Sequence, residues 1–197
     1  MAIDYKQYNY PTYTYCQEPF PNTACGPCSV ADLLEVSPIT IANWMTSHGY
    51  AAPYQGTEWE GINKCLTAYG ANGVLLATGL LGKMDSPQFK KWEETIQSGR
   101  EGILLMGRGI NNYWTNGGHY IAIVKYEAGK YLVYDPASAS RTGWHPFSDF
   151  AGDIKNLYTS SLLWGSPKTY NYAFKVATIN MGSNNKSVLL AQKILYA

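Results

Sequence analysis

The sequence predicts an α+β fold, in which an N-terminal helical half packs on a C-terminal antiparallel sheet. Two observations favour this fold. Apolar residues recur mostly at helical spacing before residue 100, whereas β-branched and aromatic runs of strand length follow it. Two of those runs are joined by a short turn at 127–129, which is typical of a hairpin. The 197 residues suffice for one domain of ordinary size, or for one domain and a fragment of a second.

Composition and charge exclude several classes of protein. Hydrophobic residues make up 46% of the chain and charged residues 15%, which indicates a globular rather than a disordered protein. The net charge of +1 gives no electrostatic reason to expect nucleic acid or a membrane surface as a partner. No apolar run approaches the roughly 20 residues that span a membrane. The first residues lack the basic and apolar pattern of a signal peptide, so we expect synthesis in the cytoplasm.

The first half of the chain predicts an arm followed by four helices. Residues 1–24 are rich in Tyr, Pro and Asn and are expected to form an ordered arm or loop. Proline stands in the first turn of two helices, at Pro27 and Pro87, and glycine stands at the end of three. The helices are expected at 26–36, 40–48, 57–70 and 86–98, with a short strand at 73–78.

After residue 100 the pattern changes to strands. The continuous apolar run 102–107 predicts a central strand, and 108–118 is a polar loop rich in Gly and Asn. Two β-branched and aromatic runs then form the hairpin, which Pro136 ends. The hairpin strands are expected at 119–126 and 130–134, a helix at 147–157, and further strands at 160–164 and 172–176.

Cys25 is the residue whose position points most directly to chemistry. Apolar residues recur behind it at helical spacing, so it stands at or just before a helix N-terminus. There the helix dipole and the free backbone N–H groups lower the pKa of a thiol. The thiolate that results is the species that attacks carbonyl carbons or disulfides.

A cysteine nucleophile needs a base, and the base needs a group that orients it. His119 begins the first hairpin strand and Asp135 ends the second, so a hairpin closed near residue 128 brings their side chains together. By contrast, His48 and His145 have no cysteine or carboxylate at metal-ligand spacing, and no nucleotide-binding glycine loop is complete. We therefore expect neither a metal nor a cofactor.

Together these segments resemble the papain-like bacteriocin-leader (double-glycine) peptidases over about residues 15–165. The matching pieces are Gln17, Cys25-Gly26-Pro27 opening a helix, Gly118-His119-Tyr120, and Val133-Tyr134-Asp135-Pro136. The resemblance implies a papain-like fold, with Cys25 as nucleophile, His119 as base and Asp135 as the group that orients the base. It also implies that the Gln17 amide stabilises the oxyanion beside the backbone N–H of Cys25. Because Gln17 stands eight residues before Cys25, a wider gap than in the family, Asn22 is the alternative donor.

The loop before His119 is the expected wall of the substrate groove. Its Tyr113, Trp114 and Gly118 are the expected substrate-binding residues, and an ordinary surface loop is the alternative. Cys28 is the alternative nucleophile, but the Cys-Gly-Pro pattern favours Cys25. Cys28 is then expected to be either a small helix residue or a resolving thiol that forms a disulfide on oxidation. The run 25–28 also has the composition of a thioredoxin redox motif, although no apolar strand precedes it.

The tail of the chain suggests a substrate. Residues 182–195 resemble the opening of peptidoglycan-binding repeat domains, with a Gly-Ser-Asn turn and then Val-x-x-x-Gln-x-x-Leu. We therefore expect a papain-like peptidase domain at 1–178, and at 179–197 a linker with the truncated first helix of a wall-binding domain. Packing of that helix on the main domain is the alternative.

The expected function is that of a cysteine peptidase or amidase that cuts peptide-type amide bonds in bacterial peptidoglycan, as an endolysin does. Such an enzyme acts on the cell wall after release or is encoded by a phage. Three alternatives stay open: a leader-peptide or protein-processing peptidase, a non-catalytic papain-like binding module, and a thiol redox protein.

Overall fold

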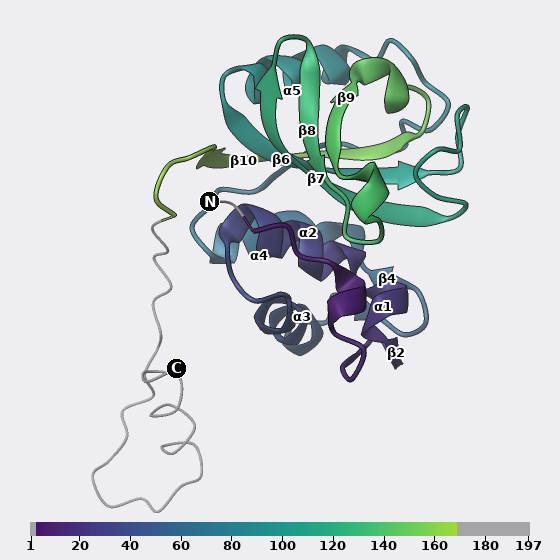
Figure 1. The fold of residues 1–197 in the computed structure, drawn as a ribbon, viewed down its shortest axis with the longest axis vertical. Coiled ribbons are helices and arrows are strands. Elements are labelled where there is room, and N and C mark those ends of the chain that lie inside the picture. Colours follow the sequence, from purple (N-terminus) through teal and green to yellow (C-terminus); the bar gives the residue numbers. More distant parts are fainter. Residues whose placement is uncertain (1–2, 169–197) are drawn as a thin grey trace, which may run out of the picture.

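The computed structural model describes residues 3–168, in which a helical half lies against one face of a sheet and one further helix covers the other face (Figure 1). This arrangement confirms the predicted α+β fold. The helices are α1 (Phe20–Thr23), α2 (Cys25–Leu34), α3 (Pro38–Ser47), α4 (Trp59–Ala68) and α5 (Pro87–Gln97), with short 3-10 helices η1 (Gln7–Asn9), η2 (Ala139–Arg141) and η3 (Phe147–Asp149).

The main sheet has six antiparallel strands in the order β5-β10-β6-β7-β8-β9. These strands are β5 (Val74–Ala77), β6 (Arg100–Gly107), β7 (Gly118–Glu127), β8 (Lys130–Tyr134), β9 (Gly143–Pro146) and β10 (Ile154–Leu163). Two small hairpins are added by β1 (Thr14–Tyr15) with β2 (Glu18–Pro19) and by β3 (Ala51–Ala52) with β4 (Gly56–Thr57). The pair β7–β8 is the hairpin that the sequence predicts.

Both faces of the central strand β6 are buried. Ile103 and Leu105 pack with the helical half, whereas Leu104 and Met106 pack with α5. A strand that is buried on both faces needs apolar residues at successive positions, which explains the unbroken apolar run in the sequence. The helix α2 lies against β7, and nine of its ten residues are buried. The helix α2 is thereby fixed over a central strand of the sheet.

The predicted helix at 147–157 is wrong. Only Phe147–Asp149 is helical, as a 3-10 turn, and β10 begins at Ile154. The pairing of β10 with β6 is irregular between Ile154 and Asn156, so Ile154 and Leu157 both pack on the α5 side. Two apolar residues three apart on one face have the spacing of a helix, and this bulge therefore imitates a helical pattern in the sequence.

Other differences are smaller. Residues 20–23 form the helix α1 instead of a loop, because the first turn of a helix tolerates Pro21. The strands β3, β4 and β9, each of two to four residues, were not expected. The expected strand at 172–176 and the segment 179–197 lie outside the described residues. Within residues 3–168, none of the helices has the length and apolar character needed to cross a membrane.

Candidate active site

Cys25 is the first residue of α2, as the sequence predicts, and its side chain is partly exposed. The first turn of α2 contains no acidic residue and no side-chain cap, so its free N–H groups are available to an anion. The backbone N–H groups of Gly26 and Tyr120 also help to lower the pKa of the Cys25 thiol. Cys25 thus lies where a helix N-terminus and the strand β7 both offer donors to a thiolate.

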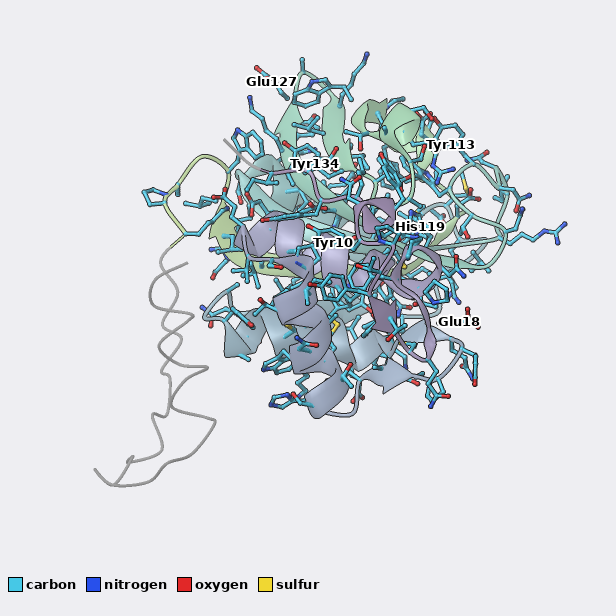
Figure 2. All side chains as sticks on the ribbon, turned by 60° about the horizontal axis from the view of Figure 1, so that its bottom comes forward. Tyr10, Glu18, Tyr113, His119, Glu127 and Tyr134 are labelled. Carbon is cyan, nitrogen blue, oxygen red and sulfur yellow. The ribbon has the colours of Figure 1, made fainter. Side chains whose placement is uncertain are left out.

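His119 is the second residue of β7, and Figure 2 shows it where the helical half meets the sheet. Its Nε2 lies 2.7 Å from Oδ1 of Asp135, and the Cys25 side chain is close enough to raise the pKa of the ring. Since Asp135 occupies Nε2, Nδ1 is the ring nitrogen left for the sulfur. The pairing of Ala122 with Tyr134 places Asp135 just beyond the end of β8, on the side of His119, as the hairpin argument predicts.

Asp135 is fully buried and makes several hydrogen bonds. Besides the His119 ring, Oδ1 accepts the N–H of Ala137 at 2.8 Å, and Oδ2 accepts Nε of Arg141 at 2.6 Å. Burial alone raises the pKa of the Asp135 carboxyl, but the hydrogen bonds and charges of His119 and Arg141 outweigh it and lower that pKa. Asp135 therefore stays ionised, and Arg141, which the sequence reasoning missed, supports it.

The pKa values of Cys25 and His119 shift in opposite directions. Burial raises the pKa of the Cys25 thiol, yet the hydrogen bond and charge of His119, together with the backbone donors, lower it overall. Burial lowers the pKa of His119, but the hydrogen bonds with Asp135 and Cys25 raise it overall to about 9. The arrangement therefore favours a thiolate beside an imidazolium, which is the reactive form of such a pair.

The other three cysteines are buried and differ from Cys25 in their chemistry. Burial raises the pKa of Cys28 well above the ordinary value, and also raises the pKa of Cys65. Burial likewise raises the pKa of Cys16, to about 11. Among the four, the environment of Cys25 is the one that favours a nucleophile. Cys28 lies one turn away from it in the core, without exposure.

Gln17 does not line the cleft beside Cys25. Cys16 and Gln17 both have left-handed backbone angles (φ 55° and 64°) and form the tight two-residue turn between β1 and β2. Gln17 is therefore exposed at a hairpin tip. The alternative donor, Asn22, is exposed as well but lines the same cleft as Cys25.

Gln7 is a buried side-chain amide that the sequence reasoning missed. Its backbone N–H donates to the carbonyl of Pro136 at 2.9 Å, and its Nε2 donates to the carbonyl of Pro21. It therefore joins the segment that follows Asp135 to the helix that precedes Cys25. Gln7 is far from Cys25 in the sequence and belongs to a segment that was expected to be an arm. No local pattern therefore indicated that its side chain would be buried near the site.

A cleft with a volume of about 290 Å³ opens beside Cys25. It is lined by Asn22, Thr23, Cys25, Ala52, Gln55, Gly56, Thr57, Glu58, Trp59, Leu105, Gly118, Tyr120 and Lys155. Its wall opposite the sheet is the small hairpin β3–β4, which is packed tightly on α2. A Cβ atom at Gly26 would overlap Oγ1 of Thr57 and lie 2.7 Å from its Cβ, so only glycine fits at that contact. The volume of the cleft suits a short stretch of an extended substrate.

Of the three predicted substrate-binding residues, only Gly118 lines this cleft. Trp114 is 1% exposed, stacks on Phe150 with ring centroids 5.3 Å apart, and donates its indole N–H to the carbonyl of Asp149 at 2.7 Å. Trp114 is therefore a core residue that anchors the loop to the α5 side of the sheet. Tyr113, labelled in Figure 2, is 46% exposed, packs edge-on against Trp114 and does not line the cleft.

Comparison with known proteins identifies the family of the chain. No curated protein sequence matches the chain significantly. Two solved structures resemble it at 13% sequence identity. The first is a C39-like peptidase from Bacillus anthracis, with a TM-score of 0.48 and coverage of 71% of this chain and 88% of that one. The second is the peptidase domain of Streptococcus ComA, a bifunctional ABC transporter of a quorum-sensing pathway, with a TM-score of 0.49 and coverage of 69% of this chain and 88% of that one. Residues 5–161 match the Peptidase_C39 like family. The chain therefore belongs to this family and is a papain-like cysteine peptidase.

Proposed function

We propose that Cys25, His119 and Asp135 form the catalytic triad of this peptidase and that its substrate is the peptide part of bacterial peptidoglycan. The observation that carries the catalytic proposal is the position of the His119 ring, which lies 2.7 Å from the Asp135 carboxylate and also interacts with the Cys25 sulfur. A nucleophile, a base and an orienting carboxylate in that order are the requirement for acyl transfer by a thiol.

The reaction follows from this geometry. The Cys25 thiolate attacks the carbonyl carbon of the scissile amide and forms a C–S bond, and the carbonyl oxygen takes up the negative charge. His119 then gives its proton to the leaving amine as the C–N bond breaks. A water molecule, whose proton His119 accepts, attacks the thioester and releases the acid. Asp135 keeps the imidazole oriented and stabilises its charged form throughout.

The oxyanion needs a donor, and Gln17 is exposed at a hairpin tip and does not line the cleft. We assign this role to Asn22 or Gln7, because Asn22 lines the cleft and Gln7 is held beside the segments that carry Cys25 and Asp135. Replacing the true donor by alanine lowers kcat by roughly a hundredfold and leaves KM nearly unchanged. The same substitution at Gln17 leaves both constants unchanged.

The choice of peptidoglycan rests on the tail of the chain. Residues 182–195 resemble the start of peptidoglycan-binding repeats, and a wall-binding segment beside a peptidase indicates a substrate in the wall. The neutral balance of charge, +1 overall, gives no support to nucleic acid or membrane lipid as the substrate. We accordingly place the site of action at the bacterial cell wall.

The experiment compares three versions of the full chain on purified sacculi: wild type, Cys25→Ala and Cys28→Ala. The loss of turbidity and the appearance of new amino groups are followed together. Wild type and Cys28→Ala are expected to clear the sacculi and release amines, whereas Cys25→Ala is expected to be slower by roughly a thousandfold or more. Cys28→Ala is the matched control, since it makes the same change one turn along the same helix.

The alternatives give different results in the same experiment. Cleavage of soluble peptides without release of amines from sacculi would favour a leader-peptide or protein-processing peptidase. Binding to sacculi without any hydrolysis would favour a binding module. Reduction of insulin in the presence of dithiothreitol would favour a redox protein.

A further inference from the structure

Lys155 reaches the cleft because of the bulge in β10. Ile154 pairs with Met106 and Asn156 pairs with Leu105, so Lys155 is the extra residue between two consecutive pairs. In a regular strand successive side chains point to opposite faces of the sheet, and an extra residue of this kind interrupts that pattern. As a result, Lys155 lines the same cleft as Cys25, on the face of the sheet that carries the helical half.

The structure leaves room for the aliphatic part of Lys155 at Gly107. A Cβ atom at Gly107 would lie 2.5 Å from Cδ and 2.7 Å from Cγ of Lys155, so any larger residue would displace the lysine. Gly107 pairs with Gly118, the residue before His119. Lys155 therefore stands two strands away from the catalytic end of β7, which is roughly 10 Å.

The ammonium group of Lys155 has no carboxylate partner among residues 3–168. The other formally charged side chain that lines the cleft is Glu58, which likewise has no ion pair within the described part of the chain. Glu58 precedes α4 on the opposite wall, and its side chain does not cap that helix. Within the described residues, the cleft thus has a free cation on the sheet wall and a free anion on the facing wall.

We infer that Lys155 is a specificity residue that binds a carboxylate of the substrate, so that the enzyme prefers peptides with an acidic group two or three residues from the scissile bond. The spacing follows from the roughly 10 Å between strands two apart and the roughly 3.3 Å rise of an extended peptide. Glu58 repels the same carboxylate from the facing wall and fixes one orientation of the peptide. This inference rests on the proposed chemistry of Cys25.

Active-site labels test the inference independently of the natural substrate. Bromoacetyl-Ala-Glu-amide and bromoacetyl-Ala-Ala-Glu-amide alkylate a thiolate and carry one carboxylate each. Their Gln analogues are neutral and of equal size. The rate of labelling at Cys25 is measured by mass spectrometry of the intact protein and of its peptides, with bromoacetamide as the reference for intrinsic reactivity.

Wild type is expected to react about tenfold faster with the Glu label than with the Gln label at one of the two lengths, a difference of about 1.4 kcal/mol. Lys155→Gln is expected to react equally with both, and Lys155→Arg to keep the preference. Lys155→Glu is expected to reverse it. Lys90→Gln, which removes an exposed charge from α5 on the other face of the sheet, is the matched control and is expected to behave as wild type.

Equal rates for the Glu and Gln labels in wild type at both lengths would overturn the role of Lys155, as would a preference that survives in Lys155→Gln. If bromoacetamide labels Cys25 at a normal rate but the Glu and Gln labels do not differ, the role of Lys155 fails while the proposed chemistry of Cys25 stands. If bromoacetamide does not label Cys25 in wild type, the proposed chemistry fails, and the inference fails with it. Thermal melting of each variant confirms that the comparison is made between folded proteins.

Discussion

Replacing Asp135 by Asn removes the negative charge beside His119 with almost no change in the shape of the side chain. The carboxylate accepts donors on both oxygens, from His119 and Ala137 on Oδ1 and from Arg141 on Oδ2. An amide has a single acceptor oxygen, so in either orientation its NH₂ group faces a donor on one side. The variant therefore loses at least one charge-assisted hydrogen bond and leaves a buried donor unpaired.

The size of both effects can be worked out from this geometry. Removing one partner of a fully buried ion pair costs about 3–5 kcal/mol. Because the Arg141 side chain is 27% exposed and keeps part of its hydration, we expect a loss of about 2 kcal/mol in the free energy of unfolding. His119 also loses the anion that stabilises its protonated form, so kcat is expected to fall by roughly a hundredfold or more.

The assay measures kcat on sacculi and urea unfolding side by side for Asp135→Asn and Asp149→Asn. Asp149 lies 2.9 Å from the His145 ring, so the chain contains a second His–Asp pair outside the cleft. Asp149→Asn is expected to leave kcat within about twofold of wild type. If Asp135→Asn loses stability but keeps kcat within about threefold, Asp135 only supports the fold and the reasoning is refuted.

Two further outcomes test the electrostatics and the cleft. The hydrolysis rate is expected to stay level through neutral pH and to fall above about pH 9, because His119, with a pKa raised to about 9, then loses the proton that the leaving amine needs. A rate that instead climbs up to pH 9, as an ordinary thiol ionises, would contradict the thiolate–imidazolium pair. Gly26→Ala is expected to raise KM by roughly tenfold, because the added Cβ would overlap Oγ1 of Thr57 and must push the β3–β4 wall of the cleft outward. An unchanged KM in steady-state kinetics would show that this wall does not contact the substrate.

Local sequence signals predicted the parts of the site that depend on local structure. The start of α2 at Cys25 follows from helical spacing and from a proline in the first turn. The approach of His119 to Asp135 follows from one hairpin, whose two strands are adjacent in sequence. In both cases the residues that decide the geometry lie within about twenty positions of each other.

The parts that the sequence did not predict depend on contacts between distant segments. Gln7 is held by Pro21 and Pro136, and Pro136 is far from Gln7 in the sequence although the two residues are in contact. Trp114, expected in the groove, is drawn into the core by Phe150, because a large aromatic side chain gains more from burial than from exposure on a loop. Nothing in the local pattern distinguishes a buried loop aromatic from an exposed one.

The bulge in β10 shows how one local irregularity can mislead and also inform. It places Ile154 and Leu157 on the same face of the sheet at helical spacing. The sequence pattern therefore predicted a helix where the structure has a strand. The same bulge turns Lys155 into the cleft. A wrong secondary-structure prediction and the proposed specificity residue therefore have one physical cause.

The most direct test of the central claim is alkylation by iodoacetamide at pH 6, followed in parallel by peptide mapping and by residual activity. The thiolate–imidazolium pair predicts that Cys25 alone of the four cysteines is modified, and that activity disappears in proportion to its modification. Modification of another cysteine first, or full activity in protein whose Cys25 is completely alkylated, would contradict the assignment of Cys25 as the nucleophile.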